Sequence, residues 1–179
     1  TVEMRTHFDK AVDLADSISL IMLAPLLVHF AAIYPSRYSL FSHKRWPTLA
    51  AYGPALALTL IEIAIRFEPL RAFLIVPPVN LRSGLNRVEM IFFTASLLVS
   101  AGLFIRTFRE ARSIVVRQQL KWVIWGMSVA AATFALFYLP SYVAVESVSS
   151  VLSLTALAPL ILIPVTLGYS IVRYRLMDV

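Results

Sequence analysis

The chain has 179 residues, 59% of them hydrophobic and 15% charged, which excludes an ordinary soluble globular domain. Its formal net charge of +6 would suit a nucleic-acid partner, but the basic residues lie in short linkers between apolar blocks. This arrangement favours anionic lipid headgroups instead, so we expect membrane lipids and no nucleic acid as partners. Cysteine is absent, so the sequence gives no information on redox compartment.

Five apolar blocks are each long enough to cross a hydrocarbon core about 30 Å thick, which takes roughly 20 residues of helix. Leu, Ala, Ile and Phe dominate these blocks and no alternation with a period of two occurs, so helices are predicted rather than barrel strands. The sequence therefore predicts an all-α fold, a polytopic transmembrane helical bundle that forms a single domain over residues 1–179. The predicted spans are 15–34, 47–65, 88–105, 120–143 and 151–172.

The first block does not have the features of a signal peptide. Acidic residues precede it where a cationic segment is required, and no cleavage site follows its apolar core. The chain also begins at Thr1 without an initiator Met, and it ends at Val179 inside a helix-like pattern. We therefore expect a segment of a longer polypeptide.

The distribution of Lys and Arg predicts the orientation in the membrane. Ten basic residues fall in the linkers after the first and third blocks and in the tail, and six fall on the opposite side. Because the side richer in Lys and Arg is normally cytoplasmic, Thr1 is expected outside and Val179 in the cytoplasm. The basic stretch RTFREARSIVVRQQLKW, between the third and fourth blocks, predicts a short amphipathic helix on the cytoplasmic surface.

No catalytic, cofactor or metal site is predicted. His29 is the only histidine well inside a predicted span, and the partners that a haem or zinc site needs are missing. We expect His29 to be a polar packing residue near the inner interface. The serines have no histidine or lysine in a plausible register for nucleophilic catalysis, and no HExxH motif occurs. The segment is therefore not expected to be an enzyme.

Two carboxylates fall inside predicted spans, where ionisable groups are costly and are functional by default. Glu62 has Arg66 four positions on, and Glu89 lies next to Arg87, so ion pairs or snorkelling groups near the outer interface are favoured over a proton or ligand site. Acidic residues also form a stripe at the start of the first block, which predicts a solvated or salt-bridged helix start rather than a cation site. The candidates for binding a signal or ligand are Glu62, Arg66, Glu89, Asp13 and Asp16.

Small residues recur four positions apart in three of the spans. This spacing lets membrane helices approach one another closely, so it predicts a packed bundle. The pairs are Gly53 with Ala57, Ser96 with Ser100, and Gly126 with Ala130.

Four stretches resemble the multi-span membrane input regions of bacterial sensor histidine kinases, including the peptide quorum-sensing kind. They are HFAAIYP, YGP, RQQLKWVIWG and PLILIPVTLGYSIVRYRLMDV, and the resemblance covers most of the chain from His29 onward. Tyr34 stands where the more usual residue is Phe. The residues that match the family pattern are His29, Phe30, Pro35, Arg117, Gln119, Lys121, Trp122, Gly126, Pro159, Pro164, Tyr174, Arg175 and Leu176.

The resemblance implies a receptor module of the bacterial cytoplasmic membrane that responds to an unknown signal ligand. Its output is not fixed, because similar membrane regions also precede serine phosphatase or cyclase domains. The sequence lacks the helix with a phospho-accepting histidine and the ATP-binding domain of the kinases. Four of the matching residues are expected to anchor the fourth span at the inner interface, with the cations toward lipid phosphates. These anchors are Arg117, Gln119, Lys121 and Trp122.

The last block is expected to relay the signal. Pro159 and Pro164 remove backbone hydrogen bonds and can bend this span, and Arg173 and Arg175 mark its exit from the membrane. A heptad seam with spacings of three, four and three begins in the same block, and its members are Tyr169, Val172, Leu176 and Val179. We expect this helix to continue into a cytoplasmic coiled coil and to join two copies in a homodimer.

The leading expectation is therefore a membrane-embedded sensor or input domain of a two-component histidine kinase or a related receptor. A transport or channel component is the main alternative, favoured if Glu62 and Glu89 face a polar cavity. A membrane enzyme acting on lipids is a third class, for which the sequence supplies no catalytic set.

Overall fold

The structure is a computed structural model that describes residues 7–34, 46–66, 78–140 and 157–175, together with Val151 and Thr155. Five helices make up most of these residues. No strand occurs in these residues, and the predicted all-α helical bundle is confirmed. A π-helical stretch, Phe134–Tyr138, extends the fourth helix, and a 3-10 turn, Ala158–Ile161, precedes the fifth. The helices are α1 (His7–Ile33), α3 (Trp46–Arg66), α5 (Pro78–Glu110), α6 (Ile114–Thr133) and α9 (Leu162–Arg175).

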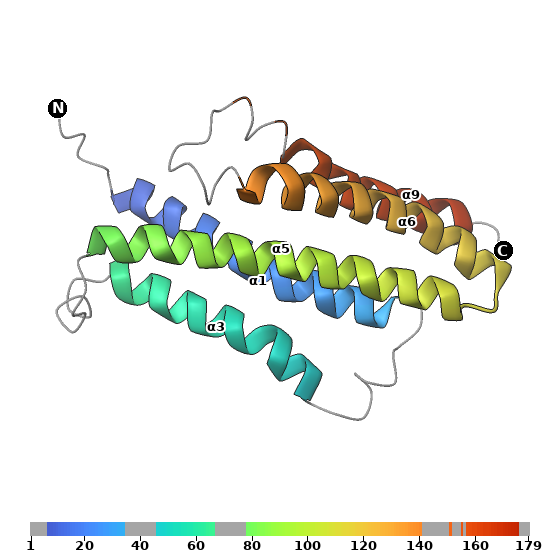
Figure 1. Cartoon of the computed structure of the whole chain (residues 1–179), viewed down its shortest axis with the longest axis horizontal. Helices are drawn as coiled ribbons and strands as arrows, with labels where there is room; N and C mark the ends of the chain where they lie inside the picture. The colour runs from blue at the N-terminus through green and yellow to red at the C-terminus, as the bar shows by residue number, and fades with distance from the viewer. Residues whose placement is uncertain are drawn as a thin grey trace.

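The longest helix, α5, is the centre of the bundle. It packs extensively against α1 and α6 and also contacts α3, while α9 packs on α6 (Figure 1). Successive helices alternate in direction, so α1 and α5 begin at the end of the bundle where α3 finishes. The ends of α1, α5 and α9 and the start of α6 lie together at the opposite end.

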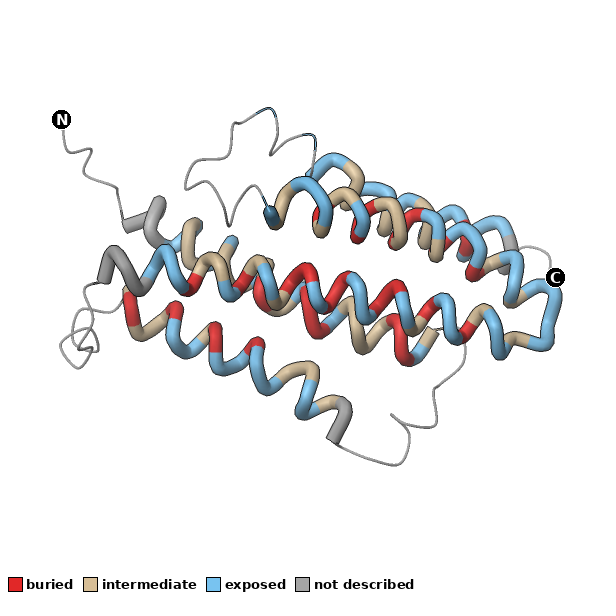
Figure 2. The backbone as a smooth tube through the Cα atoms, viewed as in Figure 1, coloured by how far each residue is buried: buried red, intermediate tan, exposed pale blue. Residues whose placement is uncertain are grey.

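Four helices are long and apolar enough to cross a membrane, over residues 11–33, 48–66, 82–110 and 114–138. The apolar part of the fifth, Ala158–Arg173, is shorter. Buried positions gather where the helices face one another, and exposed ones line the outside (Figure 2). Many outward residues are large and apolar, such as Leu60 and Leu136, an arrangement that suits lipid rather than water. The fold is that of a transmembrane helical bundle.

The helix ends differ from the predicted spans. α1 begins at His7 rather than at residue 15, and α5 covers Pro78–Glu110 rather than 88–105. A span predicted from hydropathy stops at the first charged residues, whereas a helix continues into the headgroup region, where charged side chains reach water. In the last block, predicted over 151–172, the described helical residues are Val151, Thr155 and Leu157, followed by the 3-10 turn and α9, which ends at Arg175.

The predicted short amphipathic helix over residues 106–122 is wrong. α5 continues through the first part of this stretch to Glu110, residues 111–113 are not helical, and α6 begins at Ile114. The three-residue connection is short enough to turn the chain directly from one spanning helix into the next antiparallel one. Its basic residues therefore belong to the ends of two long helices, except Arg112, which lies in the connection.

The core has two parts, and α5 contributes residues to both. The larger one joins α1, α5 and α6, and contains the edge-to-face pair of Phe93 with Phe134, whose ring centroids are 5.2 Å apart. The smaller one lies among α1, α3 and α5 and is formed by Ile21, Ala55, Leu58, Ile65 and Leu85. Buried hydroxyls inside the bundle bond to carbonyls of their own helices, as Thr94 does with Met90 at 2.7 Å and Ser100 with Ser96 at 2.7 Å. These polar groups are thus satisfied without water.

Close packing is achieved at Gly126 and not at Gly53. A Cβ atom on Gly126 would lie 2.9 Å from the Leu162 carbonyl oxygen and would overlap the Thr166 side chain, so α9 approaches the α6 backbone directly. Gly53 is exposed with nothing within 4 Å of such an atom, and Ala57 is also exposed. The predicted close approach is therefore confirmed on α6, whereas the α3 pair faces away from the rest of the described bundle.

Gly126→Ala is expected to destabilise the protein by about 1–3 kcal/mol, because the added methyl group overpacks the crossing of α6 and α9. The control is Gly102→Ala on α5, where nothing lies within 4 Å of the added Cβ and better helix propensity should leave stability equal or higher. Free energies of unfolding measured in mixed micelles check the comparison. Equal effects of the two substitutions would contradict the close approach.

Candidate functional site

A cluster of buried polar groups lies where α1, α3 and α5 meet. We call it the carboxylate site and define it by Glu62 and Arg66 of α3, Glu89 of α5 and Ser17 of α1. Glu62 is 2% exposed and Glu89 is 6% exposed, and the Arg66 side chain is 17% exposed. The sequence-predicted candidates Glu62, Arg66 and Glu89 are therefore brought together from two helices.

Arg66 donates hydrogen bonds to several groups of the carboxylate site. Its Nε and Nη2 donate to the same oxygen, Oε1 of Glu62, at 2.9 and 2.7 Å. Nη2 also donates to Ser17 Oγ at 3.0 Å and to the Asp13 backbone carbonyl at 3.3 Å. Ser17 Oγ in turn donates to that carbonyl at 3.0 Å. One guanidinium thus connects α3 to α1 and neutralises a buried carboxylate of its own helix.

Two carboxylate oxygens remain without a hydrogen-bond partner in the described part of the chain. They are Glu62 Oε2 and Glu89 Oε1, and both are buried. Glu89 also interacts electrostatically with Glu62, a like charge, and with Arg66 and Arg82. With both carboxylates ionised, Glu62, Glu89 and Arg66 carry a net charge of −1 at a position where unpaired acceptors cost about 1–3 kcal/mol each or more.

Helical spacing explains how the carboxylate site is built. Leu58, Glu62 and Ile65 lie on one stripe of α3, with Ala55 a turn earlier, and all four are buried. Leu85 lies one turn before Glu89 on α5, and Ile21 one turn after Ser17 on α1. The residues around the carboxylates are therefore those of the smaller core, and the polar groups occupy the next positions of the same buried stripes.

Two arginines interact electrostatically with Glu89, Arg66 of α3 and Arg82 of α5. Its predicted pairing with Arg87, two positions before it, stays a prediction. Residues two apart on a helix point to different sides, while Arg82 lies two turns earlier on the same side. The pairing of Glu62 with Arg66 is confirmed by their hydrogen bonds.

The acidic stripe of α1 reaches the carboxylate site at Asp13. Asp13 joins the carboxylate site through its backbone carbonyl, and Asp16 is exposed. Ser17 was missed by the sequence reasoning, although it lies four residues after Asp13, at the spacing that places both on one helix face. Only the crossing of α1 with α3 reveals that this face meets Arg66.

Chemically, the carboxylate site can take up one positive charge. Two unpaired acceptors beside each other, with one cation for two acids, favour a proton shared by the carboxylates or a small organic cation. Within the described residues, no group of three or more His, Cys, Asp or Glu side chains could hold a metal ion. The arrangement provides no nucleophile paired with a base.

The family-motif residues at the start of α6 lie at the other end of the bundle. Arg117 Nε donates to the Ala111 carbonyl at 2.9 Å, and its guanidinium lies over the Phe108 ring at 5.9 Å, so it joins the start of α6 to the end of α5. The Gln119 carbonyl accepts a hydrogen bond from Ser170 Oγ of α9 at 3.0 Å. Ser170 is the only buried residue among the described side chains of α9.

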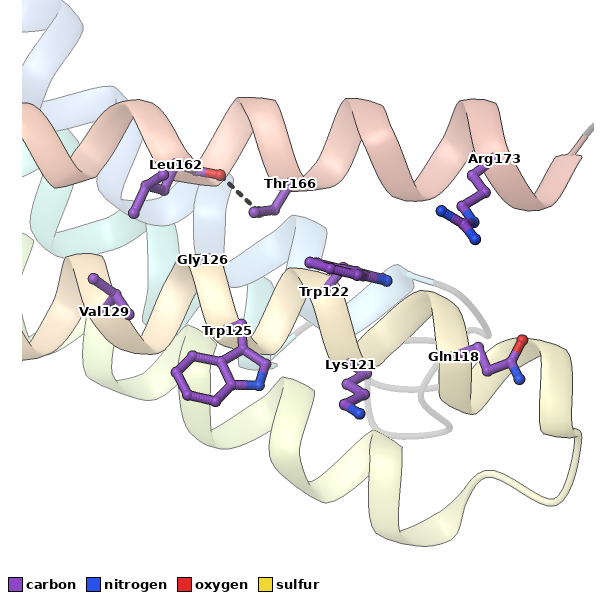
Figure 3. A pocket seen from close by; sticks show the side chains of 9 residues that line it. All are labelled: Gln118, Lys121, Trp122, Trp125, Gly126, Val129, Leu162, Thr166 and Arg173. Atoms are coloured by element: carbon purple, nitrogen blue, oxygen red, sulfur yellow. Dashed lines mark hydrogen bonds between the residues drawn. The ribbon is translucent and has the colours of Figure 1, made fainter.

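A groove with a volume of about 670 Å³ runs between α6 and α9 (Figure 3). Gly126 forms part of it, and Trp122 lies between the two helices. Trp122 contacts Tyr169 edge to face, with centroids 5.1 Å apart, and Arg173 donates to the Tyr169 hydroxyl. The full lining is Gln118, Lys121, Trp122, Trp125, Gly126, Val129, Leu162, Thr166 and Arg173.

The remaining sequence-predicted residues take separate positions. His29 Nδ1 lies 3.1 Å from the Tyr52 hydroxyl, which joins α1 to α3. Pro159 is within the 3-10 turn and Pro164 is near the start of α9, where proline is tolerated because the first N–H groups of a helix have no partner. Pro35, Leu176 and Val179 lie outside the described residues, as do the side chains of Tyr174 and Arg175.

Comparison with known proteins finds no matching family model, no matching curated protein and no matching solved structure.

Arg66→Gln is expected to lower the free energy of unfolding by about 3 kcal/mol or more, because it leaves the Glu62 charge buried without its cation. The matched control is Arg106→Gln, which breaks another i, i+4 pair, Arg106 with Glu110 at 3.0 Å. Those side chains are 57% and 56% exposed, so the loss should stay below about 1 kcal/mol. Adding Glu62→Gln to Arg66→Gln should restore part of the lost stability, and failure to do so would contradict the burial of an unpaired charge.

Proposed function

We propose that the chain is a membrane-embedded sensor or input domain of a bacterial signalling receptor. In this proposal a signal acts on the helical bundle, and α9 passes the change to a cytoplasmic output domain. The residue patterns that resemble sensor histidine kinases make a histidine kinase the favoured output. The segment itself then serves as a receptor module rather than an enzyme, in the bacterial cytoplasmic membrane.

The observation that carries the proposal is the attachment of α9. Its extensive contacts are with α6, whereas α5 is held by three neighbours. α9 contacts α6 at Gly126, which lies close to the Leu162 carbonyl oxygen and the Thr166 side chain. The Ser170 hydroxyl also donates a hydrogen bond to the Gln119 carbonyl. A helix that packs against one neighbour can shift along it by about 1–2 Å without unfolding the bundle, and such shifts are a common form of switching.

The carboxylate site is proposed as the part of the bundle that responds to the signal. It joins α1, α3 and α5, and one positive charge taken up there would pair the two unpaired oxygens and change how these helices pack. α5 contacts α6, so the change can reach α9 through two helix interfaces. A proton or a small organic cation is the proposed signal chemistry.

The exposed face of α9 suits a second copy. Val172 and Val165 are exposed, and Tyr169, the other described residue of the seam, is 39% exposed although it also contacts Trp122 of α6. Apolar residues three and four apart on an outward face are those that pack in a parallel helix pair. We propose a homodimer formed along α9 and its continuation.

Charge at the two ends of the bundle supports the proposed orientation. The end at which α6 starts carries six of the nine described Lys and Arg side chains and one described acid, Glu110. The end with the carboxylate site carries the other three, together with Asp13, Asp16, Glu62 and Glu89. By the positive-inside rule the first end faces the cytoplasm.

Cysteine labelling tests this orientation, because the chain has no cysteine of its own. Ser83→Cys, at the carboxylate-site end, should react with a membrane-impermeant maleimide in whole cells. Ser113→Cys, in the connection from α5 to α6, should react only after the membrane is opened. The reverse pattern would refute the orientation, and a permeant maleimide serves as the control for reactivity.

Insertions into α9 test the relay. In the full-length protein, one residue inserted after Arg173 rotates the following helix by about 100° and should change or lock basal output. Seven inserted residues restore the heptad phase and should largely recover the signal-dependent output. Output is measured for insertions of one to seven residues.

A smooth decline with insertion length would show that α9 is a passive tether, and the relay would be refuted. The alternative function is then a transport or channel component, which the two buried carboxylates with unpaired oxygens favour. Proteoliposomes distinguish the two functions. A transporter would show a proton or cation flux that Glu62→Gln abolishes, whereas the sensor domain should show none.

A further inference from the structure

The groove between α6 and α9 changes in chemistry along its length. Gln118, Lys121 and Arg173 lie at the end where α6 starts, and Val129 and Leu162 lie at the other. Gln118 and Val129 are eleven residues apart on α6, as are Leu162 and Arg173 on α9. At 1.5 Å per residue each wall is about 16 Å long, about half of a hydrocarbon core of about 30 Å. The groove is therefore about as long as one leaflet is deep, with its cations at one end.

The cationic end of the groove is held in place by aromatic contacts. The Arg173 guanidinium lies over the Tyr169 ring at 5.5 Å and donates to its hydroxyl, and Tyr169 contacts Trp122. Arg173 extends from α9 toward α6 (Figure 3). One bond to Tyr169 leaves most of its five N–H donors for an anion. Lys121 is exposed on the other wall, and no acidic residue lines the groove.

We infer that this groove binds one anionic phospholipid, with its phosphate between Lys121 and Arg173 and an acyl chain along Trp125, Val129 and Leu162. Basic pockets between membrane helices recognise anionic headgroups by this chemistry. The volume of about 670 Å³ lies within the usual range of ligand sites. The lipid would touch both helices that meet at Gly126, so its binding would favour one position of α9 on α6. The lipid site itself does not depend on the signalling role.

Two of the chain's three tryptophans, Trp122 and Trp125, line the groove and report on its occupant. In a Trp46→Phe background, fluorescence is measured in phosphatidylcholine vesicles that contain brominated phosphatidylglycerol or brominated phosphatidylcholine. The quenching gives the binding constant of the anionic lipid relative to the zwitterionic one. We expect a preference of about fivefold or more.

Charge variants distinguish a built site from a general surface effect. Lys121→Gln with Arg173→Gln should reduce the preference to about one, and Arg173→Lys should keep most of it. Arg109→Gln is the control, since Arg109 is an exposed cation at the same end of the bundle and does not line the groove. Circular dichroism and the free energy of unfolding establish that each variant is folded.

Three outcomes would overturn the lipid site. Equal quenching by the two lipids in the parent protein would mean that no headgroup is selected. An equal loss of preference in Arg109→Gln and in Lys121→Gln with Arg173→Gln would mean that only the surface potential acts. Weak quenching by both lipids, together with disulfide formation between copies carrying Trp125→Cys, would mean that a second copy occupies the groove.

Discussion

Helices inside a membrane gain little free energy from hiding apolar side chains, because lipid tails are as apolar as the protein core. The arrangement of this bundle therefore depends on two interactions that lipid cannot provide. One is direct packing against backbone, which Gly126 permits where α9 crosses α6. The other is polar bonding between helices, which Arg66 provides from α3 to α1. The remaining contacts, such as the ring pair of Phe93 and Phe134, fill the space that these two define.

The two interactions lie in different halves of the bundle. Arg66 joins α3 to α1 by hydrogen bonds, and Glu89 of α5 interacts electrostatically with Glu62 and Arg66. The crossing of α6 and α9 contains small and aromatic residues, one hydroxyl bond to a backbone carbonyl and no described ion pair. The first half is thus sensitive to a change of charge, and the second to a change of shape. α5 belongs to both, since it contacts α1 and α6 along its length.

The sequence was sufficient for features that depend on one helix at a time. Hydropathy located the four helices that are long and apolar enough to cross a membrane, although it predicted a fifth span where the described apolar helix is shorter, and a spacing of four paired Glu62 with Arg66. Contacts between helices were beyond it, because no spacing within α1 indicates that Ser17 meets Arg66 of α3. The electrostatic interaction of Glu89 with Arg66 was likewise beyond it, because the two residues lie on different helices. The basic stretch after the third span was misassigned because it joins the ends of two helices, each of which has its own periodicity.

The unequal charge of the two ends also couples the protein to the membrane potential. A unit charge moved across the whole membrane changes in energy by about 2.3 kcal/mol per 100 mV. In the proposed orientation the end with six cations faces the negative interior, so an energised membrane favours this insertion over the inverted one. In this proposed orientation, Glu62 and Glu89 would lie part of the way across, on the outer side. A cation that reached them from outside would therefore pass through a fraction of the field, and its affinity would rise as the interior becomes more negative.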